Sequence, residues 1–188
     1  MKHLIPLLLF LSACGGSSSP PTGPLVINLI NLHGTDQTEM LADFTEVQNQ
    51  YATQIGVELI LGTVAEMPDP VPGMVALDQR HDKFRALGKL AGKGLTYIWA
   101  GPLWSDGISY KTGEASGGCR NGYAVGFHKP RHPQNVGLMM HEIAHLLGAS
   151  HTDDDSVMSG YLPAGTNTWF DEKSIKQILT CTGDKNGA

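Results

Sequence analysis

The apolar positions of this chain fall into short continuous runs and one long helical pattern. Continuous apolar runs predict strands at Leu25–Leu32, Val57–Val64 and Leu95–Ala100, and Tyr123–Phe127 reads as a further strand. Between the first two runs, apolar side chains recur at helical spacing, which predicts a helix from near Gln37 to Ile55. The mixture of strands and helices in this order favours an α+β fold.

The rest of the chain adds a loop and three helices. The Met67–Gly73 segment contains three prolines and cannot keep regular structure, so it predicts a loop. Helical spacing predicts a short helix at Asp82–Leu90, an apolar helix at Val136–Leu147 and a last helix at about Asp171–Leu179. Since no internal repeat is visible, we expect a single domain over residues 25–188.

The N-terminal residues read as a targeting signal. Met1–His3 is short and basic, and the apolar run Leu4–Leu11 is too short to span a bilayer but suits a signal peptide. The Leu11–Gly16 segment resembles a bacterial lipobox, in which small residues precede a cysteine that receives lipid, here Cys14. The alternative is a plain secretory signal with a coincidental cysteine.

The lipobox interpretation predicts where the protein resides. We expect a signal peptide at residues 1–13 and a tether rich in Gly, Ser and Pro at residues 14–24. Lipid on Cys14 would hold the protein at a membrane without a transmembrane span. No aspartate follows Cys14, which by resemblance favours the outer membrane of a Gram-negative cell envelope.

Charge and length narrow the choice of partners. The chain has 188 residues with 13 Lys and Arg against 18 Asp and Glu, a net charge of −5 at pH 7. An acidic balance of this kind argues against nucleic acid as a partner. The roughly 165 residues beyond the tether suffice for one domain with its own core. We expect this domain to be a monomer.

The main chemical signal is the pattern H-E-x-x-H-x-x-G-x-x-H, which runs from His141 to His151. Helix positions four apart share a face, so His141 and His145 can bind one ion while Glu142 reaches the same cleft as a base. Gly148 can adopt the left-handed conformation that ends a helix and lets His151 return as a third ligand. Three protein ligands leave tetrahedral zinc one open position, which is typical of a catalytic site. The alternative is an apolar helix that carries its histidines by coincidence.

This pattern resembles the metzincin clan of zinc endopeptidases, which also have a methionine turn after the third histidine. Here Met158 lies in the Ser156–Tyr161 segment, shortly after His151. The resemblance implies that Met158 packs beneath the histidines without binding zinc. It also implies a twisted mixed sheet packed on two long helices, with a small C-terminal lobe that contains the methionine turn and a final helix.

Two positions depart from the known metzincin families, so no subfamily is assigned. Thr152 follows the third histidine, where adamalysins, astacins, matrixins and serralysins carry Asp, Glu, Ser and Pro. Astacins and serralysins place a tyrosine two residues after the methionine, whereas Tyr161 lies three residues after Met158 and is a weak candidate for a position near zinc or an oxyanion. The Asp153–Asp155 run lacks the glycine and distal glutamate of a calcium loop and reads as a solvated turn.

The ligand set predicts a peptidase mechanism. Zinc in such a site supplies a Lewis acid and acidifies water. Glu142 accepts the proton of the attacking water and returns it to the leaving amine. We expect a protein or peptide substrate to pair with a sheet edge, which the resemblance places near Gly122–His128. Two alternatives stay open: a zinc hydrolase of narrow specificity on cell-wall peptide or amide bonds, and a non-catalytic binding lipoprotein.

Histidines and tryptophans outside the motif read as structural. His128 and His132 are four apart, but the prolines around them forbid a helix, so we expect both on the surface. Trp99, Trp104 and Trp169 are expected in the core rather than in a substrate pocket, although Trp104 lies in a loop rich in Gly and Pro.

The cysteines predict one disulfide. If Cys14 carries lipid, two cysteines are left, Cys119 and Cys181. Because both would lie in an oxidising compartment, we expect them to form a disulfide. The bond would tie the segment before the zinc helix to the last helix. The alternative is two unpaired buried thiols.

Overall fold

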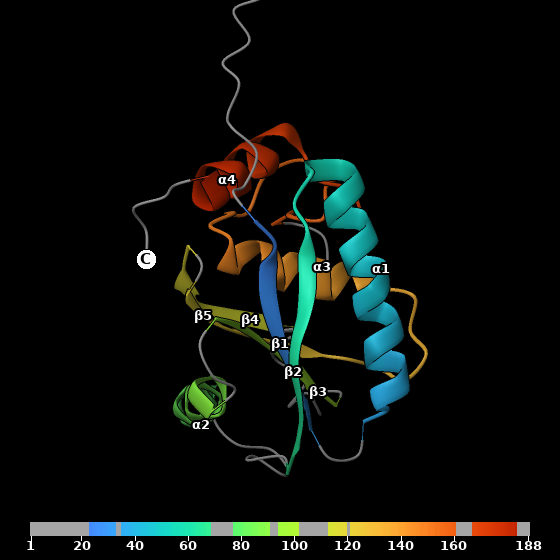
Figure 1. The fold of residues 1–188 in the computed structure, drawn as a ribbon, viewed down its shortest axis with the longest axis vertical. Helices are drawn as coiled ribbons and strands as arrows, with labels where there is room; N and C mark the ends of the chain where they lie inside the picture. The colour runs from blue at the N-terminus through green and yellow to red at the C-terminus, as the bar shows by residue number, and fades with distance from the viewer. Residues whose placement is uncertain are drawn as a thin grey trace, which may run out of the picture.

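The computed structural model describes residues 23–32, 35–68, 77–90, 94–101, 113–119, 121–160 and 167–183. The signal peptide, Cys14 and nearly all of the tether lie outside these residues, so they stay predictions. The described elements confirm an α+β fold (Figure 1). In chain order they are β1 (Leu25–Leu32), α1 (Gln37–Ile55), β2 (Leu59–Met67), α2 (Leu77–Leu90), β3 (Leu95–Ala100), β4 (Gly113–Gly118), β5 (Asn121–Phe127), α3 (Asn135–Leu146) and α4 (Glu172–Gly183).

The strands form one mixed sheet in the order β2-β1-β3-β5-β4. β1 is parallel to both β2 and β3, and β3 is parallel to β5. β4 alone runs antiparallel, paired with β5 from Gly113↔Gly126 to Gly118↔Asn121 without a shift of register. β4 and β2 are therefore the two edge strands among the described residues.

The sheet is covered on both faces, which explains why β3 is buried at every position. α1 and α3 pack on one face, against alternate residues of the strands such as Tyr97 and Ala124. α2 packs on the other face through Phe84, against Ile98 and Val125. In Figure 1 α4 lies at the end of the molecule opposite α2. The core on the α1 and α3 face is the one that positions the histidine motif.

α1 begins and ends with standard caps and fixes the place of α3. The side chain of Asp36 accepts the backbone N–H groups of Thr38 and Glu39 at 2.8 and 3.3 Å, and Gly56 ends the helix at φ 75°. Tyr51, fully buried on this helix, donates its hydroxyl to the backbone oxygen of Met140 at 2.9 Å. This bond ties α1 to α3 one residue before the motif begins.

Several element boundaries differ from the predicted ones. β2 extends to Met67, into the predicted loop, and begins at Leu59 rather than Val57. α2 begins five residues earlier than predicted, at Leu77. β4 was not predicted, because its sequence GEASGG has no apolar alternation. It is held by its ladder with β5 and packing against α3 rather than by large buried side chains.

The two edges of the sheet differ in regularity. Between Ile27 and Leu29 the register of β1 with β2 shifts, because two residues of β2 face one of β1. The buried side chain of Asn28 fills this gap, and its Oδ1 accepts the backbone N–H of Thr63 at 2.9 Å.

No described helix is both long and apolar enough to cross a membrane.

Candidate functional site

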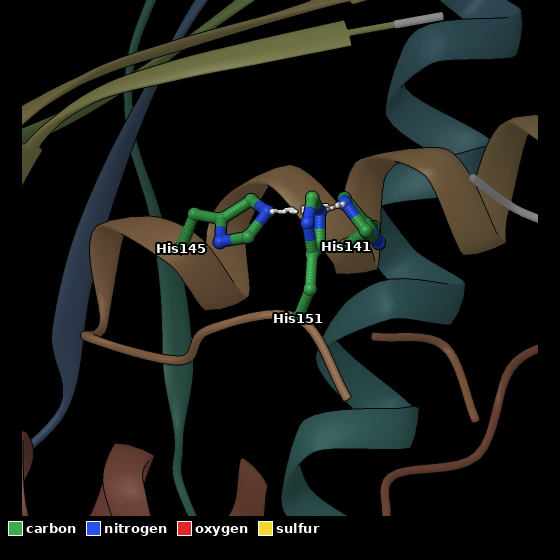
Figure 2. A group of neighbouring side chains, drawn as sticks. All are labelled: His141, His145 and His151. Atoms are coloured by element: carbon green, nitrogen blue, oxygen red, sulfur yellow. Dashed lines mark hydrogen bonds between the residues drawn. The ribbon is translucent and has the colours of Figure 1, made fainter. Parts of the chain in front are cut away.

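The three histidines of the motif converge at the end of α3 (Figure 2). His141 and His145 lie one turn apart on this helix, which is buried along most of its length. Gly148 follows in the left-handed conformation, at φ 85°, as expected for a helix end. The chain then turns back and brings His151 beside the other two, with His141 buried and His151 exposed to solvent.

The histidine side chains meet through their Nε2 atoms. The Nε2 of His145 lies 3.1 Å from that of His141 and 3.2 Å from that of His151, and the third pair is also 3.2 Å apart. Nδ1 of His141 lies 2.6 Å from the backbone oxygen of Val157, and Nδ1 of His145 lies 2.8 Å from that of Ala149. Since a carbonyl oxygen only accepts, Nδ1 carries the proton in each neutral ring and Nε2 keeps its lone pair.

The surroundings favour the uncharged imidazoles that a metal needs. Burial lowers the pKa of His141 from 6.5 to about 4, against the raising effect of its bond to Val157. Burial also lowers the pKa of His145, with an opposing contribution from its bond to Ala149. The positive charges of the neighbouring histidines would lower both values further. At neutral pH both rings therefore present free lone pairs to the centre.

The donor set fits zinc. Tetrahedral ligands at about 2.0–2.1 Å from zinc lie roughly 3.3–3.4 Å from one another, close to the 3.1–3.2 Å found between the Nε2 atoms. Lone pairs this close repel unless a cation lies among them. His141, His145 and His151 form the one group of three or more His, Cys, Asp or Glu ligand atoms found close together within the described ranges. The Asp153–Asp155 residues after them are exposed.

Glu142 directly follows His141 on α3, and its side chain lies under the edge strand β4. It is 3% exposed and belongs to the buried part of α3. A Cβ on Gly113, at the start of β4, would overlap the side chain of Glu142, so glycine leaves the room that the carboxylate occupies. Gly113 was not predicted as a residue of the site, because β4 was not predicted from the sequence. A glycine-rich segment before the motif was the only signal that could have pointed to it.

The prediction that the segment Gly122–His128 forms the sheet edge for the substrate was wrong. β5, which covers Gly122–Phe127, lies inside the sheet between β3 and β4. The edge is β4, because the short antiparallel return of the chain adds one more strand outside β5. The side of β4 that does not pair with β5 is therefore the edge nearest to Glu142.

The methionine turn lies next to the histidines. Met158 is fully buried, and its backbone oxygen accepts the N–H of Thr152 at 2.9 Å, one residue after His151. Its neighbour Val157 supplies the carbonyl that accepts from His141. The supporting role of the Met158 thioether stays a prediction, as does the role of Tyr161, which lies outside the described residues.

The predicted disulfide is confirmed. Cys119 and Cys181 are bonded, with their Cα atoms 5.3 Å apart and a sequence separation of 62. Cys119 directly follows β4, and Cys181 lies on α4. A Cβ on Gly148 would be in van der Waals contact with Cys181. The bond thus joins the edge strand to the helix that packs beside the turn after α3.

His128 is buried, not on the surface as predicted. Its ring stacks on Trp99 with ring centres 3.4 Å apart, and its Nε2 lies 2.7 Å from the hydroxyl of Tyr97. A Cβ on Gly126 would overlap both Tyr97 and His128, so this glycine opens the space for the pair. The segment forms no helix, as the prolines predicted, but its first residue, His128, packs onto the sheet against Trp99.

The tryptophans divide between core and surface. Trp99 is buried, as predicted, but Trp169 is 46% exposed, so its assignment to the core was wrong. Trp169 lies just before α4, where its backbone oxygen accepts the N–H of Val157 at 2.7 Å. His132 is half-buried, and Trp104 lies outside the described residues.

The burial of His128 predicts a loss of stability in acid. Burial lowers the pKa of His128 from 6.5 to about 3, so the folded protein keeps the ring neutral while the unfolded chain protonates it near pH 6.5. The stability that the neutral His128 contributes is therefore fully present above about pH 6.5 and is lost as the pH falls towards 3. Between pH 7 and 5 this residue is expected to contribute a loss of about 2 kcal/mol.

The measurement is urea unfolding of the metal-free protein at pH 7 and pH 5. His128→Gln should be less stable at pH 7, because it loses the stack on Trp99, but its free energy of unfolding should change less between the two pH values. His141 and His145 titrate in both proteins, so their contribution cancels in the difference. Equal pH dependence of the two proteins would contradict the prediction.

Comparisons with known proteins find similar folds among solved structures. No family model and no curated protein matches the sequence. Among solved structures, metalloproteinase-II from Bacteroides fragilis is 18% identical with a TM-score of 0.62, over 90% of this chain and 55% of that chain. Archaemetzincin from Methanopyrus kandleri is 18% identical with a TM-score of 0.59, over 86% and 97%. A zinc-dependent peptidase from Methanocorpusculum labreanum is 16% identical with a TM-score of 0.52, over 81% and 99%.

These similarities establish the fold. The chain spans little more than half the length of the Bacteroides fragilis protein and nearly the whole of the two archaeal ones. The mixed sheet, the packing of α1 and α3 on one of its faces and the grouping of the three histidines agree with the predicted architecture, whereas the strand order was not predicted. The chain therefore has the fold of zinc metallopeptidases, and its three motif histidines lie together where they could hold a zinc ion.

Proposed function

We propose that this protein is a zinc-dependent endopeptidase, with His141, His145 and His151 as zinc ligands and Glu142 as general base. The observation that carries the proposal is the convergence of three Nε2 atoms within 3.2 Å of one another, with the buried Glu142 directly after the first of these histidines on α3. The exposure of His151 leaves the centre open to solvent, as a catalytic rather than a structural site requires.

The chemistry divides between the ion and the protein. When bound, zinc supplies a Lewis acid that polarises a carbonyl oxygen and makes water more acidic. Glu142 accepts a proton from the water that attacks the scissile carbonyl and passes it to the departing amine. The burial of Glu142 under β4 excludes bulk water from one side of the carboxylate. The bonds from Nδ1 to Val157 and Ala149 keep the histidine rings aimed at the centre.

The edge strand offers a place for an extended substrate. β4 pairs with β5 on one side in regular antiparallel register, and its first residue lies over Glu142. A peptide that added to the outer side of β4 would gain main-chain hydrogen bonds while one of its carbonyl groups approached the histidines. Because main-chain bonds do not depend on side chains, this arrangement favours a peptide substrate.

Zinc analysis and peptide cleavage of the purified full-length chain test the proposal. We expect about one zinc per chain and cleavage of a random-peptide library at internal bonds, as for other sites with three protein ligands. A chelator should abolish cleavage, and added zinc, but not calcium, should restore it. Zinc without peptide cleavage would support a hydrolase of narrow specificity or a binding role instead. Absence of zinc would refute the proposed centre.

A further inference from the structure

A buried carboxylate, Asp171, lies behind the methionine turn and is 5% exposed. Its Oδ1 accepts the backbone N–H of Ser174 at 2.9 Å, as a residue that caps a helix does. Its Oδ2 accepts three hydroxyl groups, from Ser156 at 2.6 Å, Ser174 at 2.7 Å and Thr152 at 3.2 Å. A cap for α4 needs only Oδ1, so the bonds to Ser156 and Thr152 call for another explanation.

The carboxylate stays charged in this setting. Burial raises the pKa of Asp171, but the hydrogen bonds from Ser156 and Ser174 lower it by more, and the net pKa lies below its ordinary value. Hydrogen bonds to a charged acceptor are stronger than those between neutral groups. Asp171 therefore holds the turn residues more firmly than a neutral side chain would.

One route leads from Asp171 to the first zinc ligand. Ser156, which donates to Asp171, accepts the backbone N–H of Met158 at 3.1 Å. Val157, between these two residues, donates its N–H to the backbone oxygen of Trp169 at 2.7 Å. The carbonyl of Val157 then accepts from Nδ1 of His141 at 2.6 Å. The segment around Asp171 thus fixes the carbonyl that orients the His141 ring.

A second route leads to the third ligand. Thr152 directly follows His151 and donates its hydroxyl to Asp171. Its backbone N–H donates to Met158, and its backbone oxygen accepts the N–H of Gly160 at 3.0 Å. With the side chain and both backbone groups held, Thr152 leaves His151 little freedom to move away from the other two histidines.

We propose that Asp171 is a positioning residue that sets the geometry of His141 and His151 for zinc through the hydroxyls of Ser156 and Thr152. The inference rests on the proposed zinc site and deepens it. The hydrogen bonds of Asp171 go to Thr152, Ser156 and Ser174 rather than to the histidines. It acts through the turn, so its effect should appear in metal binding itself, before any catalysis.

Two serines give a matched test. Ser156 and Ser174 are both buried, and both donate to Oδ2 of Asp171 at nearly equal distances. Ser156 belongs to the methionine turn, whereas Ser174 belongs to α4. Ser156→Ala and Ser174→Ala therefore each remove one hydroxyl bond to the same oxygen, and only the first loosens the turn. Because Ser156→Ala also removes the acceptor of the Met158 N–H, Asp171→Asn, which leaves that acceptor in place, shows whether the effect comes from Asp171. A purely structural role for Asp171 predicts equal effects of the two changes.

The readouts are zinc affinity from chelator competition and the visible absorption bands of the full-length protein loaded with Co²⁺. We expect Ser156→Ala to weaken zinc binding by roughly 10-fold or more and to shift the cobalt bands. Ser174→Ala should change affinity by less than about twofold and leave the bands unchanged, although its melting temperature falls. Thr152→Val serves in place of Ser156→Ala if the latter does not fold.

The outcomes separate the two proposals. Similar zinc affinities and similar cobalt spectra for the two serine variants would overturn the positioning role while leaving the zinc site intact. Failure of the unaltered protein to bind zinc would overturn the proposed function, and the inference with it. A selective loss in Ser156→Ala, reproduced by Asp171→Asn, would support both.

Discussion

Replacement of Glu142 by glutamine is expected to lower kcat/KM for peptide cleavage by about 10²–10⁴, the contribution typical of a general base. Glutamine keeps the shape of the side chain beneath Gly113 but cannot accept the proton of the attacking water. Because Glu142 does not belong to the histidine group, zinc content should stay at the level of the unaltered protein. Steady-state kinetics together with metal analysis measure both quantities on one preparation.

A matched control separates the role of Glu142 from a general effect of charge. Glu58 is exposed, in the segment before β2, and Glu58→Gln removes the same negative charge outside the motif. It should leave both kcat/KM and zinc content unchanged. Full activity in Glu142→Gln would show that Glu142 is not the general base. Loss of zinc from that variant would show that Glu142 supports metal binding instead.

Removal of the disulfide is expected to have the largest effect on stability. Replacing both Cys119 and Cys181 by serine frees a loop closed over 62 residues, which costs about 4 kcal/mol in the chain-entropy model. For a domain of this size the melting temperature should fall by about 8–16 °C. Thermal unfolding of the double variant and of the unaltered protein at neutral pH checks this value.

A reducing agent provides the control for this prediction. Reduction of the unaltered protein should lower its melting temperature to nearly that of the Cys119→Ser, Cys181→Ser variant, and should leave the variant unaffected. Equal melting temperatures of the oxidised and reduced protein would show that the bond contributes little to stability. They would not affect the zinc site, whose ligands come from other residues.

The parts of the fold predicted from sequence are those whose signals are local. β1 and β3 are buried on both faces, so their apolar runs mark both their type and their ends. α1 was predicted with the observed bounds, since a capping aspartate and a glycine stand at its ends. β4 carries no such signal, because it is a glycine-rich edge strand whose stability comes from pairing with β5.

In the site, too, the residues with local signals could be predicted from the sequence and the others could not. His141 and His145 were predictable because a helix places them on one face whatever surrounds it. The partners of the site were not, because they come from remote segments: Gly113 on β4, and Asp171 at the start of α4. His128 was assigned to the surface because its neighbours are polar and proline-rich, and only the folded sheet reveals Trp99 beneath it.

The register shift in β2 has a consequence for association with other chains. An irregular strand is a poor template for pairing, so the bulge opposite Asn28 protects that edge against edge-to-edge aggregation. β4, by contrast, pairs with β5 without any shift of register. Of the two edges among the described residues, the one next to Glu142 is therefore the more regular template for an extended chain, whether that chain is a substrate or a second copy of the protein.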